Sequence, residues 1–174
     1  VWGSSPIINN SYWSRSMRDI GFLSETFTHQ FFSTINKRED WDRILEDEFR
    51  YCPRPFRNVL AFAFALMRYD VFVVSCRGFF LGSTPLWCWQ SLLFKVANKK
   101  TILIPYGSDS YCYRRIRSIF TIHALMIAYP AASRNQSTIC SRLDYWNRHA
   151  DVVMPGIMGP DGFGRWVVFS PSPL

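Results

Sequence analysis

Short apolar runs alternate with segments of helical length along most of the chain. The clearest runs are 69–74 (YDVFVV) and 101–104 (TILI), and a stretch rich in Trp and Leu at 85–97 separates them. Two β-branched runs joined by a helix are typical of buried parallel strands with a crossover connection. The second run leads into a polar turn, Tyr106-Gly107-Ser108-Asp109. Ligands of open α/β sheets bind outside the carboxyl edge of the strands, so this turn is a candidate site.

The same alternation extends to the rest of the chain. Strands are expected at 24–29, 71–75, 101–104, 151–154 and 166–169, and helices at 10–20, 37–50, 57–68, 85–97, 112–127 and 134–148. The helix at 37–50 is expected to be exposed and amphipathic, because Trp41, Leu45 and Phe49 repeat every four residues among charged ones. Strands that alternate with helices predict a Rossmann-like α/β fold: a doubly wound, mostly parallel sheet with helices on both faces.

The 174 residues have the length of one domain, so residues 1–174 are expected to form a single Rossmann-like domain. The chain opens on VWGSS, without an initiator Met, and this reads as the end of a first strand that runs into a loop. We therefore expect the chain to be a piece of a larger protein whose first strand is truncated.

Composition adds a large hydrophobic share and an uneven charge. Hydrophobic residues make up 48% of the chain and aromatic residues 17%, which predicts a large aromatic core, an aromatic-lined substrate cleft or an aromatic contact surface. Residues 1–50 carry six basic and eight acidic side chains, whereas residues 51–174 carry fourteen and five. A basic surface attracts anionic membranes and phosphorylated ligands as well as nucleic acid. Because no long Lys/Arg run occurs, no nucleic-acid partner is expected.

The cysteines predict a compartment. They are Cys52, Cys76, Cys88, Cys112 and Cys140, an odd number with no C-x-x-C pair, so neither a disulfide framework nor a zinc site is expected. A reducing, cytoplasmic compartment is the corresponding expectation. No apolar run reaches the roughly 20 residues that span a bilayer, and no signal peptide is visible.

Two early loops that follow strands carry candidate ligand groups. Gly3, Ser4 and Ser5 could bring backbone N–H groups to a phosphate, although such a turn is also common as an ordinary loop. Arg77, next to Gly78, could pair with a phosphate or carboxylate, or lie on the surface beside a turn.

The third candidate loop is the polar turn at 107–109. Gly107 would allow a close backbone approach, Ser108 could donate a hydrogen bond, and Asp109 could accept one from a sugar hydroxyl or cap the following helix. No metal site or catalytic triad is visible: the histidines do not cluster, and the nucleophile motif G-x-S-x-G is missing.

The order of these motifs resembles the amino-terminal domain of GT-B glycosyltransferases of the family 4 / group 1 type. The resemblance rests on 69–74 (YDVFVV), on 98–100 (NKK) followed by 102–109 (ILIPYGSD), and on 150–154 (ADVVM). The opening WGSSPIINN fits the first strand-to-helix loop of that family, so the resemblance spans nearly the whole chain.

The resemblance implies the acceptor-binding half of an enzyme with two Rossmann-like domains around a cleft, and the carboxyl-terminal donor-binding domain would be absent here. The full protein would transfer a sugar from a nucleotide-sugar donor to a saccharide or lipid-linked acceptor in cell-surface polysaccharide synthesis. It would need no cofactor and no metal, and this chain alone would be inactive. No catalytic residue is assigned by the resemblance.

The resemblance also implies roles for the candidate loops. The loop 3–5 would approach the donor phosphate or sugar across the cleft, and the turn 107–109 would shape the acceptor side. Tyr106 stands where many members have a His that contacts the donor sugar, which leaves the role of this residue open.

If the acceptor is lipid-linked, the resemblance implies that the full enzyme acts at the inner face of a membrane. The basic second part of the chain fits peripheral contact with anionic lipid. An amphipathic helix at 114–125 could dock there, and an ordinary buried helix is the alternative for that segment.

Two other functions stay open. A non-catalytic Rossmann-like module that binds a saccharide or a partner protein would have the same fold. A nucleotide-dependent oxidoreductase is disfavoured, because the G-x-G-x-x-G fingerprint is missing after the first strand.

Overall fold

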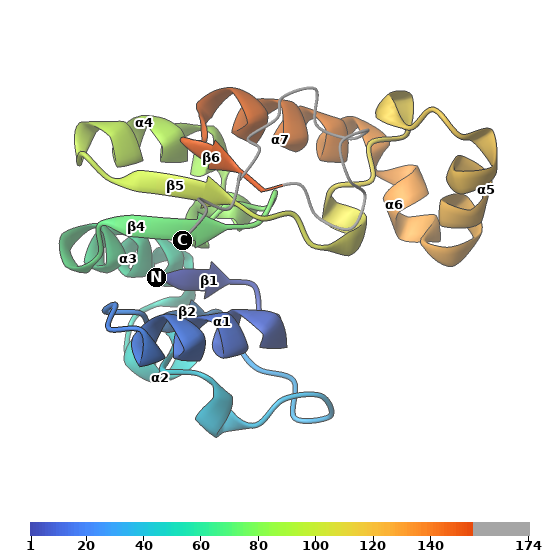
Figure 1. Cartoon of the computed structure of the whole chain (residues 1–174). Helices are drawn as coiled ribbons and strands as arrows, with labels where there is room; N and C mark the ends of the chain where they lie inside the picture. Colours follow the sequence, from blue (N-terminus) through green and yellow to red (C-terminus); the bar gives the residue numbers. More distant parts are fainter. Residues whose placement is uncertain (155–174) are drawn as a thin grey trace.

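The computed structural model describes residues 1–154, and six strands in this part of the chain form one sheet (Figure 1). The strands are β1 (Trp2–Ser4), β2 (Thr26–Thr28), β3 (Arg43–Ile44), β4 (Val71–Val74), β5 (Lys100–Leu103) and β6 (Val152–Val153). The α-helices are α1 (Ile8–Asp19), α2 (Leu45–Glu48), α3 (Arg54–Arg68), α4 (Gln90–Val96), α5 (Ile119–Ala128), α6 (Pro130–Arg134) and α7 (Gln136–His149). The strand expected at 166–169 lies outside the described residues.

The sheet has the order β3-β2-β1-β4-β5-β6, and every strand pair is parallel. The chain begins in the middle of the sheet, adds β2 and β3 on one side, and then crosses over to β4 on the other side of β1. This order confirms the doubly wound, Rossmann-like α/β fold. The winding reverses between β1 and β4, and ligands of such sheets bind in the crevice outside the strand ends at that point.

Helices cover both faces of the sheet. On one face, the ring of Trp13 in α1 lies 5.7 Å from that of Trp2 in β1. On the other face, the ring of Phe94 in α4 lies 5.2 Å from Phe62 in α3 and 4.5 Å from Phe72 in β4. Successive side chains of a strand point to opposite faces of the sheet, so each short strand contributes side chains to the packing on both faces.

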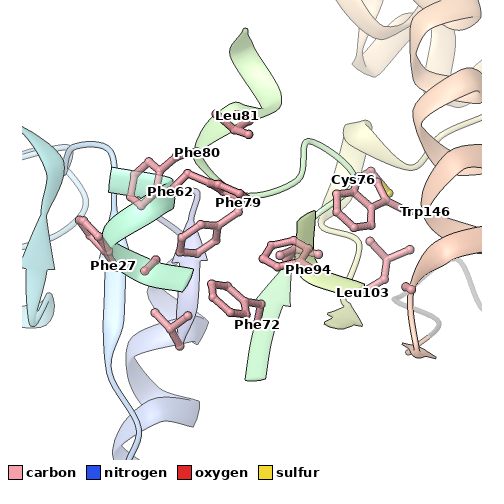
Figure 2. Close-up of a cluster of buried hydrophobic side chains, with 14 of the residues drawn as sticks. Phe27, Phe62, Phe72, Cys76, Phe79, Phe80, Leu81, Phe94, Leu103 and Trp146 are labelled. Atoms are coloured by element: carbon pink, nitrogen blue, oxygen red, sulfur yellow. The ribbon is translucent and has the colours of Figure 1, made fainter. Parts of the chain in front are cut away.

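The core on the α3 and α4 side is mainly aromatic. Figure 2 shows Phe72, Phe79 and Phe94 close together beside β4. The ring of Phe79 lies 5.2 Å from Phe72, and the ring of Phe80 lies 4.4 Å from Phe27 in β2, both edge to face. Such pairs are favourable arrangements of the ring quadrupoles. Because Phe79 and Phe80 stand at the far end of the loop 75–78 that follows β4 and are buried, they anchor that loop.

The prediction of an exposed helix at 37–50 is wrong. That segment forms a 3₁₀ turn at Arg38–Asp40, then β3, then the single turn of α2. The Asp42 carboxylate accepts hydrogen bonds from the backbone N–H of Thr26 (2.8 Å) and from its hydroxyl (2.9 Å). These bonds hold the segment against β2 as an edge strand and bury Trp41 and Ile44. The four-residue spacing of apolar side chains therefore reflects a turn and a strand rather than one helix.

The helix expected at 112–127 is interrupted. A 3₁₀ turn at Tyr113–Arg115 comes first, and α5 begins at Ile119. Neither form expected for this segment is observed: no residue of α5 is buried, and its apolar residues are not confined to one face. Within the described part of the chain, no helix is both long enough and apolar enough to cross a bilayer.

The absence of disulfides expected from the cysteine pattern is also wrong. Cys112 and Cys140 form a disulfide, with a separation of 28 residues in sequence. The bond joins the segment before α5 to α7, where Gln136 adds two hydrogen bonds: it accepts from the N–H of Tyr113 (2.8 Å) and donates to the carbonyl of Tyr111 (2.8 Å). Odd cysteine number excludes complete pairing but not one pair. The remaining cysteines, Cys52, Cys76 and Cys88, are free.

Replacing Cys112 by Ser is expected to lower the free energy of unfolding by about 3–4 kcal/mol, because the bond restricts a long loop of the unfolded chain. Urea denaturation of the oxidised protein measures this loss. Reduction of the wild type should produce a similar loss, whereas Cys88→Ser, at a free and exposed cysteine, should produce none. Equal stability of oxidised wild type, reduced wild type and Cys112→Ser would contradict the assignment of this bond.

Candidate functional site

A cavity of about 860 Å³ lies outside the carboxyl ends of β1, β2, β4 and β5. Its volume is within the range of small-molecule sites, roughly 300–1,000 Å³. The loops after these four strands form one side, and α6 and α7 form the other. The polar residues that line it are Ser4, Ser5, His29, Gln30, Asn58, Cys76, Arg77, Ser83, Tyr106, Ser108, Asp109, Asn135, Thr138 and Arg142.

The first loop reaches the cavity through its two serines. The Ser4 hydroxyl donates to the carbonyl of Gly78 (3.3 Å), and the Ser4 carbonyl accepts from the hydroxyl of Thr28 (3.1 Å). Gly3 does not line the cavity; a Cβ there would meet the carbonyl oxygen of Phe27 at 1.9 Å. The glycine therefore serves the packing of β1 on β2.

The loop after β4 holds Arg77 at the cavity. The Arg77 N–H donates to the Ser75 hydroxyl (3.2 Å), and the Gly78 N–H donates to the Ser75 carbonyl (2.8 Å). A Cβ on Gly82 would meet the Arg77 carbonyl oxygen at 1.7 Å, so the chain also passes close on the other side. The backbone of Arg77 is thus fixed, while its exposed side chain has no hydrogen bond or ion pair among the described residues.

Asp109 joins two of the loops. Its carboxylate accepts from the N–H of Tyr106 (3.0 Å), after β5, and from the N–H of Cys76 (3.2 Å), after β4. Asp109 does not cap the following helix as expected; its bond to Tyr106 instead caps the 3₁₀ turn Gly107–Asp109, which Asp109 itself ends. Burial raises the pKa of Asp109 to about 7, and the backbone hydrogen bonds oppose that increase only in part.

Tyr106 connects the β5 loop to α1. Its hydroxyl donates to the side-chain oxygen of Asn10 (2.6 Å), and its ring stacks on Trp13 with centroids 6.2 Å apart. Burial, followed by the charge of Asp109, raises the pKa of Tyr106 well above its ordinary value. The hydroxyl is therefore a neutral donor that fixes one wall of the cavity.

The structure brings together most of the residues expected at the site. Ser108 lines the cavity, and its hydroxyl makes no hydrogen bond with any described residue. Gly78 and Gly107 do not line the cavity: Gly78 packs against Gln90 and Trp146, and Gly107 occupies a turn at φ +59°. The lining residues among the candidates are Ser4, Ser5, Arg77, Tyr106, Ser108 and Asp109.

Two charged or titratable residues of the lining were not expected from the sequence. His29 follows β2, and its ring lies 4.8 Å from that of Phe80. Burial, followed by the charge of Arg77, lowers the pKa of His29 to about 4, so the imidazole is neutral at pH 7. The position of His29 directly after a strand could have identified it. Arg142 lies within α7, and no local pattern in the sequence points from there to the cavity.

The cavity offers hydrogen-bonding groups that the protein itself leaves unused. Within residues 1–154, no hydrogen bond or ion pair engages the side chains of Ser5, Gln30, Arg77, Ser108 or Thr138. Hydroxyl, amide and guanidinium groups suit a polar ligand with several oxygens. The described residues contain no group of three or more His, Cys, Asp or Glu that could hold a metal ion.

No family model, curated protein or solved structure matches the chain. A function must therefore be argued from the fold, the cavity and the resemblance of the sequence motifs.

The Asp109 carboxyl is expected to titrate near pH 7, which carbon-13 NMR of the side-chain carboxyl measures directly. Because this pKa lies above the ordinary value of 3.8, the folded state holds a proton that the unfolded state has lost. The free energy of unfolding should therefore fall as the pH rises from about 4 to about 7.

The variant Asp109→Asn assigns the NMR signal and should lack this pH dependence. Asp19→Asn, at an exposed carboxylate of α1, is the matched control and should keep it. A carboxyl that titrates at 3.8 would contradict the burial effect on Asp109.

Proposed function

We propose that this chain is the acceptor-binding amino-terminal domain of a GT-B glycosyltransferase. In the full protein it would help transfer a sugar from a nucleotide-sugar donor to a saccharide or lipid-linked acceptor in cell-surface polysaccharide synthesis. The observation that carries the proposal is the cavity at the point where the winding of the sheet reverses, lined by unused hydrogen-bonding side chains. The order of the sequence motifs supports the same assignment.

The proposed contribution of this domain to catalysis is positional. Ser108, Ser5 and Thr138 would bind hydroxyl groups of the sugars, and Asp109 would keep the β4 and β5 loops in register. Holding two reactants in a reactive geometry can lower the activation barrier of a bimolecular step substantially. The proposal needs no cofactor beyond the nucleotide-sugar substrate and assigns no catalytic residue to this chain.

A non-catalytic saccharide-binding module is the second candidate. The same cavity and the same unused hydroxyl groups favour it, because they would bind a sugar whether or not transfer follows. The two candidates differ in one measurable property, which is turnover of a nucleotide-sugar by the full protein.

A lipid-linked acceptor is supported by the exposed surface of α5. Apart from Thr121 and His123, every residue of this helix is apolar, and none is buried. Ile119, Phe120 and Ile127 are exposed by 73%, 85% and 70%. Figure 1 shows α5 and α6 at one end of the molecule, away from the sheet. A helix that is apolar all round and exposed to water needs an apolar neighbour.

The charge around α5 favours an anionic lipid surface as that neighbour. Residues 110–143 contain five arginines and no Asp or Glu. Arg117 and Arg134 are exposed and make no ion pair or hydrogen bond with any described residue. Apolar side chains flanked by cations are typical of segments that lie in the interface of an anionic membrane.

This surface lies next to the proposed sugar site. α5 contacts α6, and α6 contributes Ala131 and Ala132 to the cavity lining. A lipid-linked acceptor at the membrane surface would therefore have its polar head near the cavity while its tail stayed in the bilayer.

The cytoplasmic location expected from the sequence stays a prediction. The bond between Cys112 and Cys140 weighs against it, because structural disulfides persist mainly in oxidising compartments. The redox state of Cys112 and Cys140 in the cell would therefore indicate on which side of the membrane the domain is located.

Substitution of Ser108 by Ala tests the sugar site. In the full-length protein we expect kcat/KM for sugar transfer to fall about tenfold, as for the loss of one hydrogen bond to the substrate. Release of the nucleoside diphosphate from a panel of nucleotide-sugars measures the rate. Ser141→Ala, at an exposed serine of α7, should leave it unchanged. Saccharide binding without any nucleotide-sugar turnover would favour the non-catalytic module and contradict the glycosyltransferase proposal.

Substitution of Phe120 by Glu tests the lipid surface. Cosedimentation with phosphatidylglycerol–phosphatidylcholine vesicles should weaken at least about tenfold, since the change removes an inserted ring and adds a negative charge. Leu23→Glu, at an equally exposed apolar residue outside this region, should have no effect. A vesicle affinity that Phe120→Glu leaves unchanged would contradict the proposal, and so would a concentration-dependent dimer that Phe120→Glu dissociates.

A further inference from the structure

Two arginines from distant parts of the sequence line the same cavity. Arg77 follows β4, and Arg142 lies in α7. Consistent with this shared lining, the charge of Arg77 contributes, after burial, to lowering the pKa of Arg142 below its ordinary value. Perturbed charged groups that line one cavity are candidates for a binding site.

The Arg142 side chain is held at one end only. It donates to the carbonyl of Gly82 (2.8 Å), and its Cζ lies 5.5 Å from the ring centre of Trp87. A guanidinium carries five N–H donors in a fixed fork. The single hydrogen bond to Gly82 orients the group and leaves further donors for a ligand.

Arg77 differs because only its backbone is held. The turn that begins at Ser75 and the close approach of Gly82 fix the point from which the side chain extends. Its guanidinium contacts no carboxylate within the described part of the chain. Arg77 and Arg142 thus combine one oriented donor group with one that can adjust.

The one carboxylate of the described lining, Asp109, interacts with the charge of Arg77 but can balance at most one of these two charges. Among the described lining residues Asp109 is the only acidic one, and both of its oxygens accept from backbone N–H groups. Its pKa, raised to about 7 by burial, leaves it partly protonated at neutral pH. The cavity therefore carries excess positive charge.

We infer that Arg77 and Arg142 form a binding subsite for a phosphate or diphosphate ester. Planar guanidinium groups bind phosphate oxygens through pairs of charge-assisted hydrogen bonds. The inference rests on the proposed function and deepens it: the ester belongs to the diphosphate of the nucleotide-sugar or to the lipid phosphate that carries the acceptor.

Binding of inorganic pyrophosphate to the 174-residue chain tests the subsite without requiring sugar transfer. Isothermal titration calorimetry at fixed ionic strength should show saturable binding that Arg77→Gln and Arg142→Gln each weaken at least about tenfold, as expected for one charge-assisted contact. Arg148→Gln removes an exposed arginine of α7 that does not line the cavity and should have no effect. The thermal midpoint of each variant is the check on folding.

If Arg142→Gln does not fold, Arg142→Lys replaces it. Lysine keeps the charge but loses the fork, so pyrophosphate binding should weaken while the thermal midpoint is retained. Absence of saturable pyrophosphate binding would overturn the inference, as would equal weakening by Arg148→Gln.

Competition experiments then distinguish the two sources of the ester. Displacement of pyrophosphate by a nucleoside diphosphate, but not by farnesyl phosphate, assigns the subsite to the donor, and the reverse order assigns it to the acceptor lipid. Displacement by neither would contradict an ester of either kind at this subsite. Because pyrophosphate binding is independent of turnover, the subsite stands even if the full protein transfers no sugar. Turnover without pyrophosphate binding would retain the proposed function and remove the subsite.

Discussion

The cavity depends on one half-buried carboxylate. Asp109 accepts a hydrogen bond from the loop after β4 and another from the loop after β5, and so fixes the distance between two loops that no strand pairing holds. The bond to Cys76 positions the turn that presents Arg77, and the bond to Tyr106 positions the ring that reaches α1. The energetic cost is a carboxyl group whose charged form is disfavoured by burial.

The fold follows from local patterns that a reader of the sequence can see. The β-branched run of β4 and that of β5 bracket a helical stretch, and in a parallel sheet both strands must end at the same edge. Six of the expected site residues meet in one cavity for that reason. The prediction that the many aromatic residues form a large core agrees with the structure, because Phe72, Phe79 and Phe94 are buried in the core.

The features that the sequence did not reveal depend on contacts between distant residues. The segment 37–50 does not form one helix, because Asp42 accepts a hydrogen bond from Thr26, sixteen positions away, and the residues after Asp42 pair with β2. Cys112 meets Cys140 only because α7 turns back past the segment before α5. Arg142 reaches the cavity from the side of a helix whose own periodicity is ordinary. The spacing of residues describes positions along one helix or strand, so it does not predict contacts between residues that are distant in the sequence.

The closest backbone approaches among the described glycines lie at the border of the cavity. Gly3 touches the main chain of β2, and Gly82 touches the main chain beside Arg77, each with no space for even one methyl group. The floor of the cavity is thus set by peptide groups in direct contact. Natural variation could exchange the side chains that face a ligand while these two positions stay invariant, so the shape of the depression would outlast changes in its chemical preference.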